Sequence, residues 1–72
     1  MRDEASLARL LAQIWGDVPA EQRPNLIAAL GEFPFKRAYE ALGRIVSGEL
    51  DSVARASDCR AAAYDALAAL GT

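Results

Sequence analysis

Apolar residues recur along this chain at helical spacing, in stretches separated by proline and glycine. The first stretch begins at Asp3 or Ser6 and is ended by Gly16. Its apolar positions follow the i, i+3, i+4, i+7, i+8 template of an amphipathic helix: Leu7, Leu10, Leu11, Ile14 and Trp15. The pattern therefore predicts a first helix that buries one face.

Two prolines mark the connection to the second predicted helix. Pro24 cannot lie inside a helix that begins at Pro19, because proline removes a backbone hydrogen bond. We therefore expect a short turn and then a helix from about Arg23 or Pro24 through Leu30, which Gly31 stops. Its apolar face has three members: Leu26, Ile27 and Leu30.

Pro34 stands where a third helix is expected to begin, and the Ser-Gly pair at 47–48 where it should end. Six apolar residues form its predicted buried side: Phe35, Ala38, Tyr39, Leu42, Ile45 and Val46. On the other side, Glu40 and Arg44 have the spacing of an i, i+4 ion pair. Gly43 interrupts this helix, which suggests that a neighbouring helix crosses closely there.

The stretch from Ser57 to Gly71 is typical of a helix with both ends marked. Ser57 and Asp58 are good N-cap candidates, and Gly71 suits the left-handed residue that follows a helix. Residues 49–56 contain no glycine or proline, so a separate short helix and one long helix through Leu70 both stay open. We favour a break near Ser57. The apolar stripe of the last helix has six members: Cys59, Ala62, Ala63, Ala66, Leu67 and Leu70.

The two halves of the chain resemble each other. LIAALG at 26–31 matches ALAALG at 66–71, and LARLL at 7–11 matches LGRIV at 42–46. An ordered pair of helical matches 35 to 40 residues apart indicates an α-solenoid.

The second half, FPFKRAYEALGRIVSG followed by DCRAAAYDALAALG, resembles a HEAT or armadillo-like repeat. The match to the second helix of such a repeat consists of Cys59, Arg60, Ala63, Ala66-Leu67 and Leu70-Gly71. In the first half, Pro24 interrupts the equivalent helix, and Arg23 stands where a small residue like Ala63 is expected. The resemblance implies a scaffold or protein-binding surface without shared catalytic residues.

These patterns predict an all-α fold in a single helical domain, 1–72. We expect a small bundle of four to five helices, arranged as two HEAT-like antiparallel helical hairpins. The repeat-like halves are 3–31 and 34–71.

Composition limits how stable such a bundle can be. A core in a chain of 72 residues supplies only about 3–5 kcal/mol of folding stability unless a cross-link such as a disulfide or a metal adds to it. A single cysteine forms no internal disulfide, and a chain without histidine has no recognisable zinc site. Sixteen of the residues are alanine, which favours helix but buries little area. Close helix packing, or a partner, has to supply the difference.

Charge and hydropathy exclude several partners. Eight basic and ten acidic residues are interspersed and give a net charge of −2, so no single-sign field attracts nucleic acid or an anionic membrane. No apolar stretch approaches the roughly 18–20 residues that span a bilayer, and the beginning of the sequence does not resemble a signal peptide. We expect a cytoplasmic protein without a membrane partner.

Candidate catalytic chemistry is sparse. Cys59 is either a thiol activated by a helix N-terminus or, as its apolar position favours, a small core residue. Asp58 and Asp65, or Asp3 and Glu4, are the carboxylate pairs that could serve in acid/base chemistry. Without histidine, a nucleophile elbow or a glycine-rich phosphate loop, we expect no enzyme, no cofactor, no metal and no small-molecule substrate.

The function that these features favour is a small non-enzymatic protein-protein interaction module. It would act as an adaptor or inhibitor of a larger assembly and bind through a helical face. Five residues are the predicted partner-binding set: Lys36, Arg37, Glu40, Arg44 and Trp15. Arg37 and Arg44 are the preferred members, because a guanidinium can hold a carboxylate with two hydrogen bonds. Trp15 is either a partner anchor or a lid on the core.

Two further hypotheses concern other surfaces. The alternative function is a nucleic-acid-associated helical domain that uses the surface arginines, although the net charge argues against it. The Ala-rich last helix predicts a homodimer or a docked partner, because both its sides are nearly free of charge. The alanines assigned to this contact are Ala61, Ala62, Ala68 and Ala69.

Overall fold

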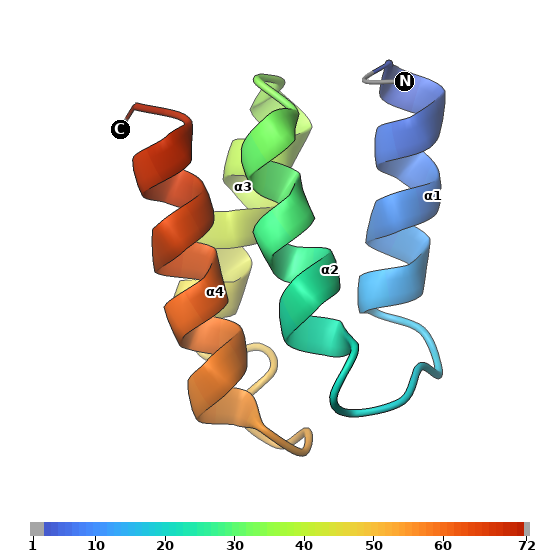
Figure 1. The fold of residues 1–72 in the computed structure, drawn as a ribbon, viewed down its shortest axis with the longest axis vertical. Coiled ribbons are helices and arrows are strands. Elements are labelled where there is room, and N and C mark those ends of the chain that lie inside the picture. The colour runs from blue at the N-terminus through green and yellow to red at the C-terminus, as the bar shows by residue number, and fades with distance from the viewer. Residues whose placement is uncertain (1–2, 72) are drawn as a thin grey trace.

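Four α-helices and one 3-10 turn make up the computed structural model, which describes residues 3–71 (Figure 1). The elements are α1 (Glu4–Ile14), α2 (Arg23–Ala29), η1 (Leu30–Glu32), α3 (Lys36–Val46) and α4 (Ala56–Ala69). No strand occurs among the described residues. The predicted all-α bundle is confirmed, with four helices.

Consecutive helices run in opposite directions, so α1 and α3 point one way and α2 and α4 the other (Figure 1). α2 lies between α1 and α4 and packs against both, while α3 packs against α4 and η1. The second and last helices therefore lie side by side, as a repeated hairpin requires. The HEAT-like identity of the hairpins stays a prediction.

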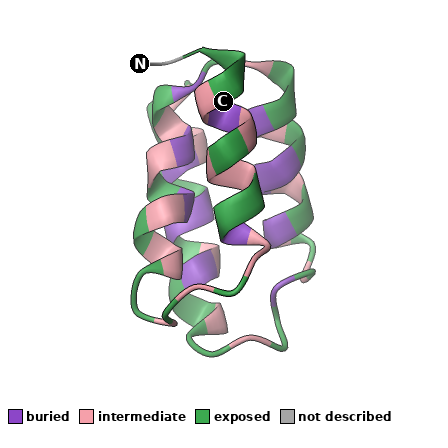
Figure 2. Ribbon diagram, turned by 90° about the vertical axis from the view of Figure 1, so that its right-hand side faces the viewer, coloured by how far each residue is buried: buried purple, intermediate pink, exposed green. Residues whose placement is uncertain are grey.

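The core is made of the inward faces of all four helices (Figure 2). Its fully buried larger side chains come from every helix and from η1: Leu7, Ile14, Ile27, Leu30, Leu42, Ile45 and Cys59. Three alanines of α4 continue this surface: Ala62, Ala63 and Ala66. Because these side chains are small, the backbone of α4 can approach its neighbours closely.

Gly31, within η1, lies directly against the backbone of α4. A Cβ atom there would lie 3.2 Å from the Ala66 Cα, 3.2 Å from the Ala69 Cβ and 3.3 Å from the Ala66 carbonyl oxygen. A Cβ atom at Gly43 would meet nothing within 4 Å. The expectation of a close crossing at Gly43 is therefore wrong, and Gly31 is the glycine that permits one.

The two ends of α1 are fixed by side chains. Of the two predicted starting residues, Asp3 is the N-cap, and its carboxylate accepts a hydrogen bond of 2.8 Å from the Ser6 amide. At the other end, Arg23 donates from Nε to the Ile14 carbonyl at 3.0 Å and from Nη2 to the Gly16 carbonyl at 2.8 Å. These carbonyls have no partner within the helix, so the first residue of α2 completes the end of α1.

Two predicted boundaries around the third connection differ from the structure. Gly31 does not stop the second helix, because the chain continues through it as η1 to Glu32. Pro34 does not begin the third helix: α3 starts two residues later, with Phe35 as an extended N-cap. Proline keeps the preceding Phe33 out of the helical region, and the extended Phe35 delays the first helical turn.

The break before the last helix is confirmed, but its cap is not the predicted one. α4 begins at Ala56, and Arg55 is its N-cap, in a left-handed conformation with φ of 62°. Ser57 and Asp58 lie inside the first turn. The left-handed residue turns the chain into the helix without a capping hydrogen bond from its side chain. At the other end, Gly71 has a φ of 83°, as its predicted role requires.

The described helices are also too short or too polar for a bilayer: none of them could cross a membrane.

Candidate functional site: the groove between α1 and α3

A groove of about 830 Å³ separates α1 from α3. It arises because α1 packs mainly against α2, and small residues on the facing sides of α1 and α3 leave the space between them unfilled. Eleven residues line this α1–α3 groove: Ala8, Leu11, Ala12, Trp15, Arg37, Glu40, Ala41, Gly43, Arg44, Ser47 and Glu49.

Each wall is one face of a helix. The α1 wall is formed by residues 8, 11, 12 and 15, and the α3 wall by residues 37, 40, 41 and 44. Both sets have the i, i+3, i+4, i+7 spacing that places side chains on one side of a helix. Four of the five predicted partner-binding residues are thus brought to one groove: Trp15, Arg37, Glu40 and Arg44.

Lys36 is the fifth predicted residue and does not line the groove. It is exposed at the first position of α3, one residue before the wall begins.

Arg44 bridges the groove at the end where α1 finishes. Its guanidinium carbon lies 4.7 Å from the centre of the Trp15 ring, which is a cation–π contact. The same guanidinium donates from Nε to Glu49 Oε2 at 2.6 Å and from Nη2 to Glu49 Oε1 at 2.8 Å. This pairing raises the pKa of Arg44 and lowers the pKa of Glu49.

The turn at the end of α3 places Glu49 beside Arg44. Gly48 has a φ of 110°, and its amide donates to the Ile45 carbonyl at 3.1 Å. The Glu49 amide donates to the Arg44 carbonyl at 3.2 Å. This is the Schellman arrangement, in which a left-handed glycine folds the chain back over the last helical turn. The ion pair at the groove is therefore built by a backbone motif.

The predicted ion pair between Glu40 and Arg44 is wrong, because Arg44 pairs with Glu49. Arg44 was also expected to hold a partner's carboxylate with two hydrogen bonds. Its Nε and Nη2 groups already donate to the Glu49 carboxylate. Arg37 and Glu40 are exposed and have no ion-pair partner among the described residues. The groove thus holds one unpaired cation and one unpaired anion, one helical turn apart.

Gly43 lies in the middle of α3, on the groove, with open space at its Cβ position. We expect Gly43→Ala to raise the free energy of unfolding by about 0.5–1 kcal/mol, because alanine favours helix and meets nothing there. Urea denaturation followed by circular dichroism measures this. A loss of stability would show that the backbone at this position has a requirement that the groove geometry does not reveal.

Cys59 is fully buried in the core, so the structure places it as a packing residue. Desolvation raises the pKa of its thiol, and the nearby Arg23 opposes this only in part. Burial and the raised pKa both disfavour the reactive thiolate.

We expect the native protein to react with iodoacetamide roughly 100-fold more slowly than the protein in urea, because the thiol must be exposed by opening first. The control is Ser57→Cys in a Cys59→Ala background, which puts a thiol on the exposed first turn of the same helix. Equal rates for the native wild-type protein and this control would contradict the prediction.

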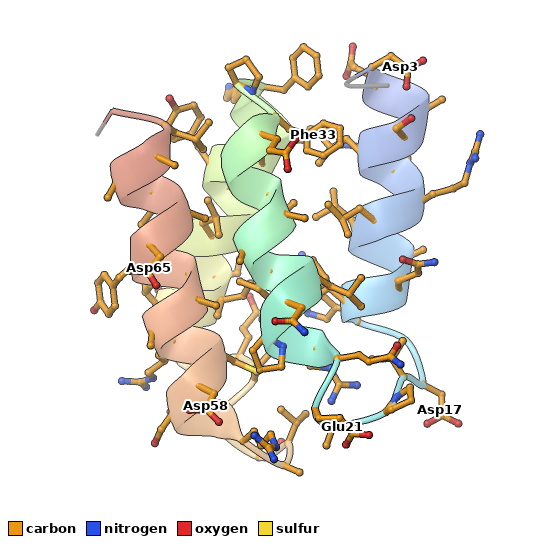
Figure 3. All side chains as sticks on the ribbon, in the orientation of Figure 1. Asp3, Asp17, Glu21, Phe33, Asp58 and Asp65 are labelled. Atoms are coloured by element: carbon orange, nitrogen blue, oxygen red, sulfur yellow. The ribbon has the colours of Figure 1, made fainter. Side chains whose placement is uncertain are left out.

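The candidate acid/base carboxylates do not converge on a cavity. Asp58 and Asp65 lie on the outer side of α4 and point away from the bundle (Figure 3). Asp3 holds a helix amide, and this hydrogen bond lowers the pKa of its carboxyl group. Within residues 3–71, no group of three or more Cys, Asp and Glu side chains is placed to hold a metal ion.

The Ala-rich surface of α4 is narrower than predicted. Ala62 is buried in the bundle, and the remaining three alanines are exposed: Ala61, Ala68 and Ala69. Tyr64 lies among them with 59% of its surface exposed. The homodimer through this helix stays a prediction.

Several groove residues were missed from the sequence. Ala8 and Ala12 carry no chemical signal, although their spacing from Leu11 and Trp15 places them on one helix face. Glu49 belongs to the groove only through the turn at Gly48. No family model matches this sequence, and comparison with curated proteins and with solved structures gave no match either.

Proposed function

We propose that this chain is a small non-enzymatic protein-protein interaction module that binds its partner in the α1–α3 groove. The observation that supports this is the gathering of Trp15, Arg37, Glu40 and Arg44 in one open groove. Aromatic residues and arginine are the side chains most enriched in protein interfaces. An adaptor or an inhibitor of a larger assembly would use such a surface.

Most arginines of the described surface already have partners within the chain, which favours a protein partner over nucleic acid. Arg44, Arg55 and Arg60 each pair with a carboxylate, and Arg23 donates to two carbonyl groups. Phosphate binding depends on cations that are free to replace counterions. Few remain on the described surface, so the nucleic-acid alternative has little support.

The test uses Gly43→Gln, which adds a long side chain at a groove position where a Cβ atom would meet nothing within 4 Å. Glutamine is also a better helix former than glycine, so the fold should be kept. We expect that partner proteins captured from the source cell by the wild-type chain and identified by mass spectrometry are lost with this variant.

The matched control is Ala61→Gln, the same kind of enlargement on the exposed face of α4. It should leave capture unchanged. If capture survives Gly43→Gln and fails with Ala61→Gln, the binding surface is the Ala-rich face of α4 and the proposal is wrong. Thermal unfolding of both variants verifies that they are folded.

A further inference from the structure

The walls of the α1–α3 groove limit the shape of what can bind there. Both walls are helix surfaces, whose backbone amides and carbonyls are already paired along the helix. An extended peptide gains affinity by pairing its backbone with a sheet edge, and residues 3–71 contain no strand that could offer one. A helical segment needs no backbone partner, because its hydrogen bonds are internal.

The dimensions agree with a helix of about two turns. The walls run from residue 8 to 15 on α1 and from 37 to 44 on α3, which corresponds to about 11 Å. The groove is open along its rim, where Ala12, Arg37, Glu40 and Ser47 are exposed. A small molecule would keep much of its surface in water there, whereas small-molecule sites usually enclose 70–90% of a ligand, as a rough range.

Close approach of a helix backbone is allowed by the small lining residues. Ala8 and Ala12 on α1 face Ala41 and Gly43 on α3 across the groove. Gly43 weakens the helix relative to alanine, and a Cβ atom there would meet nothing within 4 Å. A helix that crosses at this point would need the space that a side chain at Gly43 would fill.

Charge specifies the occupant further. Arg44 is neutralised by Glu49, which leaves Arg37 and Glu40 as the unpaired charges of the α3 wall. A complementary helix carries an acidic residue opposite Arg37 and a basic residue opposite Glu40. Because these two positions are one turn apart, the partner's charges must be three or four residues apart.

The helix dipoles favour one direction for the bound helix. α1 and α3 run the same way (Figure 1), so a helix that lies antiparallel between them has its dipole opposite to both, which is the favourable arrangement. An antiparallel helix reaches the Glu40 level before the Arg37 level. Its basic residue therefore precedes its acidic residue in sequence.

We infer that the α1–α3 groove binds an amphipathic helix of a partner protein, antiparallel to α1 and α3, with Lys or Arg three or four residues before Asp or Glu. This inference rests on the proposed function and names the class of partner.

The test is a yeast-display library of 18-residue helices with Ala and Leu fixed on one face. The flanking positions are varied among Lys, Glu and Gln. Clones are selected that bind the wild-type chain and not the Gly43→Gln chain. We expect enrichment of Lys three or four residues before Glu, and a selected peptide with the two charges exchanged should bind about tenfold more weakly.

Trp15 supplies the affinity measurement, since it is the only tryptophan of the chain and lies in the groove. The double variant Arg37→Glu, Glu40→Lys changes two exposed side chains and should reverse the enriched order. The inference is overturned if no clone distinguishes wild type from Gly43→Gln, or if both receptors enrich the same order.

Other outcomes separate this inference from the proposed function. If cellular capture is lost with Gly43→Gln while no helix is selected, the function stands and the helical partner is wrong. If helices are selected and cellular capture is unaffected, the proposed function is wrong. A dimer in sedimentation that disappears with Gly43→Gln would assign the groove to a second copy and also overturn the inference.

Discussion

Replacing Arg23 with alanine is expected to lower the free energy of unfolding by about 2–3 kcal/mol, as measured by urea denaturation. The change removes two charge-assisted hydrogen bonds to the carbonyls of Ile14 and Gly16. It also leaves these carbonyls at the C-terminal end of α1 without their cationic partner, in a part-buried position. In a domain of this size, such a loss is a large share of the total stability.

Arg9→Ala is the matched control for Arg23→Ala. Arg9 is exposed on α1, so its replacement removes the same side chain from a solvated position. We expect a change within about 0.5 kcal/mol. Similar losses for the two variants would mean that the hydrogen bonds of Arg23 contribute nothing beyond the removal of an arginine.

Gly31→Ala is expected to destabilise the protein by about 1–2 kcal/mol. The new methyl group would lie 3.2 Å from the Ala66 Cα and 3.3 Å from its carbonyl oxygen, which belong to the backbone of α4. A backbone cannot move aside as a flexible side chain can, so α4 has to shift away from η1. The overpacking outweighs the gain in helix propensity.

The comparison with Gly43→Ala makes this test specific, because the same substitution is made at two glycines and opposite signs are expected. Only the position facing α4 lacks room for a methyl group. A stabilising effect at Gly31 would contradict the close contact between η1 and α4. Chemical denaturation of both variants under one set of conditions gives the comparison.

The sequence predicts the helices well, because apolar periodicity and proline or glycine punctuation are local signals. The end of α3 at the Ser-Gly pair and the role of Gly71 follow directly from them. The start of α4 was wrongly predicted at Ser57, because Ser57 is a good capping residue in sequence but the backbone already turns before it. The left-handed Arg55 already turns the chain, so the helix begins earlier.

The buried face of α3 was only partly predicted. Ala38, Leu42 and Ile45 were predicted on the buried side and are fully buried, but the prediction omitted Ala41, which is also buried. Tyr39 lies at the side of the helix, where its hydroxyl donates to the Leu70 carbonyl at 3.1 Å. An alanine packs in the core where two helices approach closely, and that proximity is a tertiary property that periodicity does not encode.

The sequence predicted the charged residues of the groove but not the groove itself. Four predicted binding residues line it, but the pairing of Arg44 with Glu49 depends on the left-handed turn at Gly48. The open space depends on how far α1 lies from α3. That distance is set by the packing of α1 on α2, which no local pattern specifies.

The way α1 is attached to the bundle affects which part of the fold opens first. α1 packs mainly against α2 and is tied at its end by Arg23, whereas α2, α3, η1 and α4 are joined by several mutual contacts. Detaching α1 alone therefore exposes less apolar surface than global unfolding does, and such subglobal openings have lower free energies. Amide hydrogens of α1 should exchange with solvent earlier than those of α4. The α1 wall of the groove thus belongs to the least protected unit of the fold, so a ligand held there would stabilise that unit first.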